Sequence, residues 1–224
     1  MCGIYGFFSI SSIHLNSTLE NFASENAKRG PDSRGFLHQD NIFMGMYRLA
    51  ITGIGNGQQP IFSRDGNVAL ICNGEIYNYK QLRSDLKRNN GCNFKTDTDV
   101  EVILQGYLTF GIEFFSKLSG MFAFAIFDKK INKLIVSRDK FGIKPLYHLD
   151  DEKGLFFSST ISSFKQLKCE ISAENLTNQI IQGYSIGENT LLRNVKMMPP
   201  GTVHSYQVIN QSIVKQVHRL SDYR

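Results

Sequence analysis

The chain has 224 residues, 42% of them hydrophobic, and a formal net charge of +5 at pH 7. This length and composition suffice for one domain with a complete core. The 25 basic residues never form a run of five, which disfavours a nucleic-acid-binding surface, and no apolar stretch approaches the ~18 residues of a membrane span.

The four cysteines are spread along the chain, without a Cys-x-x-Cys pair or a cysteine–histidine cluster at zinc-site spacing. Free thiols in a reducing compartment fit this pattern better than a disulfide framework. The apolar N-terminus has no basic segment before it and soon turns polar, unlike a signal peptide. We therefore expect a cytoplasmic protein without a metal site. The cysteines are Cys2, Cys72, Cys92 and Cys169.

The N-terminal segment predicts a strand followed by a helix. Residues 2–10 are typical of a short buried strand. A helix is predicted from Ser17 to Lys28, because Ser17 and Glu20 form a capping-box pattern, apolar residues recur at helical spacing, and Gly30 can end it.

The central segment predicts two strands and then two helices. One helix begins after Asn78 and stops near Asn90, where a glycine follows. Thr98 and Glu101 form a second capping-box pattern, which opens the next helix. The two strands are at 42–51 and 68–76.

Residues 121–139 predict a β-hairpin, because two β-rich runs are joined by a polar turn. The first run, Met121 to Phe127, is apolar at every position, so we expect it to be buried on both faces. Such strands with helices outside indicate a layered α/β sandwich. No repeat or Pro/Gly/Ser linker divides the chain, so a single domain over residues 1–224 is predicted.

The chain opens with MCGIYGFF, which places a cysteine directly behind the initiator methionine. This stretch alone leaves two interpretations open. Cys2 can simply begin an apolar strand. Alternatively, removal of Met1 makes Cys2 an N-terminal residue with both a thiol and a free amine.

Other stretches carry polar residues that a fold alone does not require. RGPDSRG (29–35) sets two arginines and an aspartate in a tight turn, either as a solvated loop or as part of a site. Arg48 stands amid the apolar YRLAI and needs an anionic partner, which can be a substrate carboxylate or a structural acid.

Two further polar stretches follow the second central strand. Asn73 and Gly74 in NGEIYNY either form a plain turn or supply two hydrogen-bond donors to one oxygen. Asp99, in TDTDVE, either complements the dipole of the following helix or holds the ammonium group of a ligand.

These motifs together resemble one known family. CGIYG, RGPDSRG, RLAI, NGEIYNY, GMFAFAIFD and RDKFGIKPLY occur in order, and LLRNVKMMPPG extends the likeness over roughly 90% of the chain. The chain resembles the glutaminase domain of class II glutamine amidotransferases, specifically of glutamine-dependent asparagine synthetases. The resemblance implies an α+β fold, the four-layer αββα sandwich of N-terminal-nucleophile hydrolases.

The resemblance also implies roles for individual residues. Cys2 would be the nucleophile after removal of Met1, with Asn73 and Gly74 as the oxyanion hole. Arg48 would bind the α-carboxylate of L-glutamine, and Glu75 and Asp99 would hold its α-amino group. The backbone of four further residues would line the pocket: Leu49, Ala50, Ile51 and Thr52.

General chemistry agrees with these roles. An ordinary thiol titrates near pKa ~8.5 and an α-amine near ~8, so a neighbouring amine can take the thiol proton and later protonate departing ammonia. Hydrolysis would then proceed through a γ-glutamyl thioester, releasing ammonia and glutamate without a cofactor. Arg138, Asp139, Lys140 and Lys144 resemble a structural motif of the family and are assigned no chemistry.

Asparagine synthetases also carry an ATP-using domain with a Ser-Gly-Gly-x-Asp-Ser loop, which this sequence lacks. Residues from about 202 are therefore expected to be a C-terminal extension leading toward an absent synthetase domain. The expected partners are L-glutamine and an ammonia-accepting, ATP-dependent synthetase domain or protein, as in asparagine biosynthesis, and homo-oligomerisation stays open. Two alternatives remain: a catalytically silent glutamine-sensing or partner-binding module, and an N-terminal-nucleophile hydrolase acting on a different amide.

Overall fold

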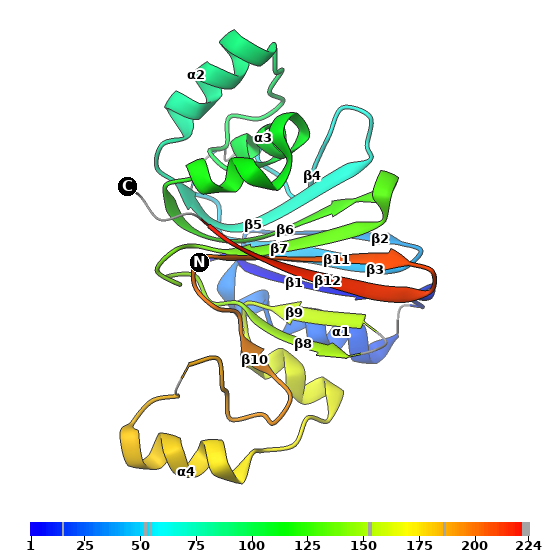
Figure 1. Ribbon diagram of the computed structural model, residues 1–224, viewed down its shortest axis with the longest axis vertical. Coiled ribbons are helices and arrows are strands. Elements are labelled where there is room, and N and C mark those ends of the chain that lie inside the picture. Colours follow the sequence, from blue (N-terminus) through cyan, green and yellow to red (C-terminus); the bar gives the residue numbers. More distant parts are fainter. Residues whose placement is uncertain (15, 52, 54, 152–153, 186, 221–224) are drawn as a thin grey trace.

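The computed structural model describes residues 1–14, 16–51, 53, 55–151, 154–185 and 187–220. Two six-stranded antiparallel sheets lie face to face, and helices cover the outer face of each (Figure 1). The order of the first sheet is β10 (Lys196–Met197), β8 (Tyr147–Asp151), β9 (Gly154–Ser158), β1 (Gly3–Ser9), β3 (Ile42–Arg48) and β2 (Ser33–Gln39). The order of the second is β12 (Ser212–Arg219), β11 (Thr202–Ile209), β7 (Lys133–Arg138), β6 (Gly120–Asp128), β5 (Val68–Ile76) and β4 (Ile61–Phe62).

The core consists of three apolar layers, as a four-layer sandwich requires. One lies between the sheets, one between the second sheet and its helices, and one between the first sheet and its helices. Strand β6 shows why the predicted hairpin is buried on both faces. Its large residues Phe122, Phe124 and Ile126 pack toward the helices, while Ala123 and Ala125 pack toward the facing sheet. The four-layer α+β prediction is confirmed.

Two helices and several short 3₁₀ helices (η) cover the second sheet or connect its strands. The helices are α2 (Tyr79–Asn90) and α3 (Glu101–Phe110), followed by η2 (Gly111–Lys117), and η3 (Lys129–Ile131) joins β6 to β7. Both predicted helices therefore exist. The Thr98 capping box is wrong, because the Glu101 carboxylate accepts hydrogen bonds from the backbone N–H groups of Lys95 and Thr96 instead.

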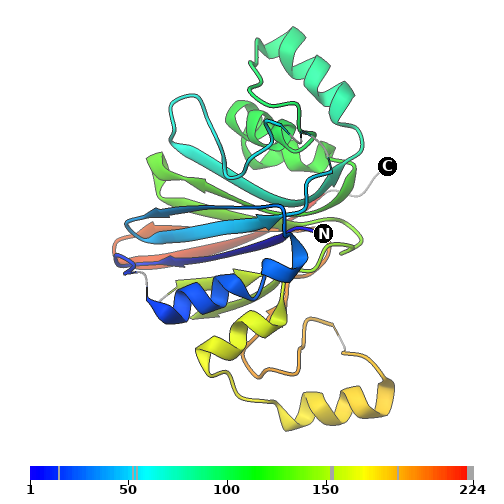
Figure 2. The same cartoon turned by 180° about the vertical axis from the view of Figure 1, so that it is seen from behind.

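The first sheet is covered by α1 (Ser17–Ser24) and η4 (Ile161–Leu167), as the view from behind shows (Figure 2). Helix α1 ends earlier than predicted, and a separate 3₁₀ helix, η1 (Ala27–Arg29), follows it. The N-cap is Asn16, whose side-chain oxygen accepts from the N–H of Leu19, so the Ser17 capping box is wrong. Asn caps as well as Ser and stands one position earlier.

The C-terminal third contains elements that the sequence analysis did not predict. The residues from about 202 onward, expected to be an extension, form β11 and β12, and β11 pairs with β7 inside the second sheet. Helix α4 (Ala173–Gln182) buries none of its side chains and lies away from the sandwich (Figure 1). No helix of the described residues is long and apolar enough to cross a membrane.

Candidate active site

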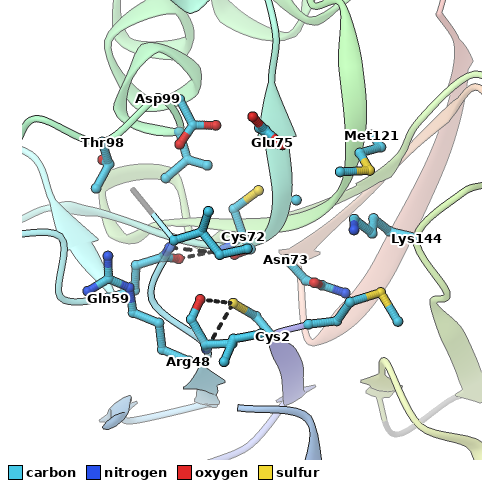
Figure 3. Close-up of a pocket in the computed structure, with 15 residues that line it drawn as sticks. Cys2, Arg48, Gln59, Cys72, Asn73, Glu75, Thr98, Asp99, Met121 and Lys144 are labelled. Atoms are coloured by element: carbon cyan, nitrogen blue, oxygen red, sulfur yellow. Dashed lines mark hydrogen bonds between the residues drawn. The ribbon is translucent and has the colours of Figure 1, made fainter. Parts of the chain in front are cut away.

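A cavity opens where the beginning of β1, the end of β3 and the end of β5 meet (Figure 3). Its empty volume is about 530 Å³, including the solvent at its mouth. Ala50 is not part of its wall, and Thr52 lies outside the described residues. Eight of the predicted site residues line it: Cys2, Arg48, Leu49, Ile51, Asn73, Gly74, Glu75 and Asp99.

The Cys2 thiol is held in place at the start of β1. Its Sγ accepts a hydrogen bond from the N–H of Leu49 at 3.3 Å and lies 3.5 Å from the Leu49 carbonyl oxygen. The Cys2 carbonyl accepts from Nε of Arg29 at 3.0 Å. Ser159 binds both backbone groups of Ile4, which fixes the strand behind the thiol.

Arg48 ends β3 as a buried cation. Its side chain is 4% exposed and Nη2 donates to the carbonyl of Gly53 at 3.0 Å. The loop after it is held by Asp32, whose carboxylate accepts from the N–H of Ala50 at 2.8 Å. RGPDSRG is therefore not a solvated tight turn: Arg29 and Asp32 fix the two segments beside the thiol, and the stretch from Ser33 belongs to β2.

The end of β5 supplies two donors. Asn73 is 1% exposed, and its Nδ2 is buried without a hydrogen-bond partner among the described residues. A buried amide left unpaired costs about 1–3 kcal/mol, so such groups are rare unless they serve a ligand. The next residue is Gly74, where any Cβ would lie 2.2 Å from the Met121 carbonyl oxygen. Only glycine fits there.

Two carboxylates lie on the side of the cavity opposite Cys2 and Arg48 in Figure 3. Asp99 is 3% exposed, and its Oδ2 accepts from the N–H of Ile76 at 2.7 Å. Glu75 is half-buried and is the next-to-last residue of β5. The Arg48 cation, two acids, two donors and the Cys2 thiol thus share one cavity, which suits a substrate that carries an amino-acid head group and a reactive carbonyl.

Sequence reasoning missed several residues of the cavity wall. Cys72 was interpreted as core; it is buried, and burial raises the pKa of its thiol well above the ordinary value, yet it also lines the cavity. Lys144 is only 6% exposed and lines the cavity as well. The sequence signal that could have identified Lys144 is its position as a lysine within the apolar stretch GIKPLY. Nothing in the sequence pointed to Gln59 or Thr98.

The RDKFGIKPLY stretch has the structural role that was expected. The Arg138 guanidinium donates to the carbonyls of Gly142, Lys144 and Met198. The Asp139 carboxylate accepts from four backbone N–H groups. These belong to Phe122, Phe141, Ile143 and Lys144.

The chain belongs to the glutamine amidotransferase domain family, whose model matches residues 1–218. It is 37% identical over 208 residues to asparagine synthetase [glutamine-hydrolyzing] 1 of Bacillus subtilis (strain 168), covering 90% of this chain and 33% of that protein. It is 36% identical over 159 residues to asparagine synthetase B [glutamine-hydrolyzing] of Escherichia coli (strain K12), covering 70% of this chain and 28% of that protein. The chain thus spans about a third of the length of these relatives.

Two solved structures share the fold. Glutamine phosphoribosylpyrophosphate amidotransferase from B. subtilis, complexed with ADP and GMP, superposes with a TM-score of 0.65 at 20% identity, covering 98% of this chain and 49% of that one. An allosteric regulatory enzyme of purine biosynthesis superposes with a TM-score of 0.68 at 19% identity and the same coverage, 98% and 49%. The predicted N-terminal-nucleophile hydrolase fold is confirmed.

Proposed function

We propose that the chain carries out the glutaminase half-reaction of a class II amidotransferase, hydrolysing L-glutamine to glutamate and ammonia through a thioester on Cys2. One observation carries this proposal. The unpartnered Nδ2 of Asn73, buried at 1% exposure, and the Cys2 thiol line the same cavity. A buried donor without a partner next to a thiol is what a developing oxyanion needs.

The amino-acid head group of glutamine, which lies at the opposite end of the substrate from the reacting carboxamide, is held by charged side chains. Arg48 binds the α-carboxylate, and Glu75 and Asp99 bind the α-ammonium group. Leu49 and Ile51, which line the cavity, contact the substrate between head group and thiol. The support is the placement of Arg48 and both acids around one cavity, and the hydrogen bond that Asp32 accepts from the N–H of Ala50, which fixes the loop.

The chemistry needs Met1 to be removed, which gives Cys2 a free amine. The amine takes the thiol proton, and the thiolate attacks the Cδ carbonyl of glutamine. The N–H of Gly74 and the Asn73 amide stabilise the oxyanion; one such donor contributes about 3–4 kcal/mol. The oxyanion collapses, the protonated amine gives its proton to the leaving nitrogen, and ammonia departs. Water, deprotonated by the same amine, then cleaves the thioester to release glutamate and the thiol.

The ammonia passes to an ATP-dependent, asparagine-synthetase-like acceptor domain or protein. The support is that the chain matches only about a third of synthetases that hydrolyse glutamine. Hydrolysis itself uses no cofactor, and ATP is required only by the acceptor. We also propose that the chain is a single domain and acts in the cytoplasm, on the grounds of its continuous sheets and its free thiols.

The test is the intact mass of the protein before and after incubation with a diazo-ketone analogue of glutamine. Loss of Met1 and one adduct on Cys2 are expected, together with release of glutamate and ammonia from glutamine. Cys2→Ala removes the adduct and the activity, whereas Cys169→Ser, a thiol outside the cavity, changes neither. Retained Met1, or an adduct elsewhere, contradicts the mechanism and favours a silent binding module. Simple amides in place of glutamine test for a different substrate.

A further inference from the structure

Beside the cavity, strand β5 has an edge that no strand of the described residues covers. On its other side it pairs with β6, where Gly74 lies opposite Phe122. The backbone groups of Phe122 bind Asp139 instead, so those of Gly74 must point to the open edge. Strand β4 covers this edge only at Ala69 and Leu70.

Two side chains take the place of the missing strand. The Gln59 amide bonds both backbone groups of Cys72: Oε1 accepts from its N–H at 2.6 Å and Nε2 donates to its carbonyl at 3.5 Å (Figure 3). Asp99 accepts from the N–H of Ile76 at 2.7 Å. Alternate residues of a strand present their backbone groups to the same edge. Gly74 lies between these two, and its N–H has no partner among the described residues.

Gln59 is itself held firmly. Its side chain is 7% exposed and lines the cavity. Its backbone carbonyl oxygen packs against β2 so closely that a Cβ on Gly35 would lie 1.9 Å from it. The backbone of Gln59 therefore packs against the first sheet, while its side-chain amide holds the edge of the second. This connects the two sheets at the point where the nucleophile and the donors must be aligned.

From this geometry we infer that Gln59 is a positioning residue for the oxyanion hole, an inference that rests on the proposed glutaminase function. By reproducing the two ladder bonds of an absent strand, it fixes the peptide groups on the N-terminal side of Asn73. Asp99 fixes the group on the C-terminal side. The Gly74 N–H and the Asn73 amide between them then point at one oxygen. A primary amide of this length supplies one donor and one acceptor to the same backbone residue.

The inference separates two steps of the reaction. Gln59 acts on the transition state, because the oxyanion forms only after attack, and it does not act on the binding of the head group. Removing both of its bonds therefore lowers kcat and leaves KM nearly unchanged. A direct contact of Gln59 with bound glutamine would instead change KM. A purely structural role would lower the unfolding temperature and leave both constants of the folded enzyme unchanged.

The test compares Gln59→Met, which keeps the length of the side chain and loses both bonds, with Gln59→Glu, which keeps the acceptor and loses the donor. Gln81→Met, at an exposed position of α2, is the matched control. We expect Gln59→Met to lower kcat about 10–100-fold, because small misplacements of catalytic groups have effects of this size, with KM within about threefold. Gln59→Glu also lowers kcat. The control leaves both constants unchanged.

Reaction of Cys2 with iodoacetamide, which forms no oxyanion, should proceed at the wild-type rate in all three variants and shows that the thiol is intact. A kcat within twofold of wild type in Gln59→Met, or a rise in KM alone, overturns the inference. An inactive wild-type enzyme overturns the proposed function, and this inference with it. An active wild-type enzyme with unaffected variants overturns this inference only.

Discussion

Among the described residues, the active-site cavity and the space between the sheets both bury polar nitrogen atoms without hydrogen-bond partners, and the two places differ in what those atoms face. In the active-site cavity the atom is Nδ2 of Asn73. Between the sheets, His148 on β8 and His204 on β11 both have ring nitrogens without hydrogen-bond partners among the described residues, with ring centroids 5.7 Å apart. Asp150, Tyr206 and Lys215 lie beside them; we refer to these five residues as the histidine cluster.

The two sites differ in their walls. The histidines border a small cavity whose other walls are mostly aliphatic and aromatic, without a thiol. Asn73 borders a cavity of about 530 Å³ that also holds Cys2 and Arg48. An unpartnered donor beside a nucleophile with room for a substrate can act on a transition state, whereas one against apolar walls only lowers stability. Substitutions should therefore change activity at the first site and stability at the second.

The largest effect is expected from Asn73→Ala. Loss of one oxyanion donor should lower kcat about 10²–10³-fold. The free energy of unfolding should fall by no more than about 1 kcal/mol, because the amide makes no bond through Nδ2 that folding would lose. Steady-state glutamine hydrolysis and urea unfolding measure the two quantities. A large loss of stability with unchanged kcat would mean that Asn73, like the histidines, affects stability rather than activity, and would contradict the proposed difference between the two sites.

Arg48→Lys should have the next largest effect. A guanidinium binds a carboxylate through two parallel bonds and an ammonium group cannot, so kcat/KM for glutamine should fall about 10–100-fold, chiefly through KM. The nearby Lys144→Arg variant keeps a charge in the same cavity and serves as a control for altered electrostatics. An unchanged KM in Arg48→Lys would exclude Arg48 from head-group binding.

The amino-acid sequence predicted the layers and the motif residues, and it did so for physical reasons. The run 122–127 has to be buried on both faces because every side chain is apolar. Helix α2 stops where Gly91 adopts a φ of 64°. The two capping-box predictions were wrong, because Asn16 rather than Ser17 caps α1 and the Glu101 carboxylate reaches back to the N–H groups of Lys95 and Thr96. Gln59 could not be predicted, since its role depends on which edge of β5 stays open, and pairing sets that edge.

The stability of the histidine cluster should depend on pH. Burial, aided by the positive charge of Lys215, lowers the pKa of His204 to about 4, whereas an unfolded histidine titrates near pH ~6.5. Between these values the unfolded chain binds the proton and the folded chain does not, so the free energy of unfolding falls as pH decreases from 6.5 to 4. A loss of about 2 kcal/mol is expected over this window.

Urea unfolding between pH 4.5 and 7.5 measures this slope. His204→Leu, which cannot bind a proton, should flatten it and leave kcat at pH 7 unchanged, while His218→Gln, at an exposed position of β12, should leave the slope as it is. Titration of Asp150 does not contribute to the change in stability between pH 6.5 and 4. His148 and Lys215 hold the pKa of its carboxyl well below the usual range, so its contribution is lost only at lower pH. If the free energy of unfolding of His204→Leu still falls with decreasing pH as in the wild type, His204 is not the cause of the pH dependence.

Tyr206→Phe should have the smallest effect and probes the same cluster without changing a charge. The hydroxyl donates to Asp150 at 3.4 Å, a long bond, and Lys215 continues to pair with that carboxylate when the hydroxyl is gone. The free energy of unfolding should fall by about 0.5–1 kcal/mol, with kcat and KM unchanged. Because burial raises the pKa of the Tyr206 phenol, the hydroxyl stays neutral across the assay range, and the loss should not vary with pH. A change in kcat would mean that the two sites are coupled through the layer between the sheets.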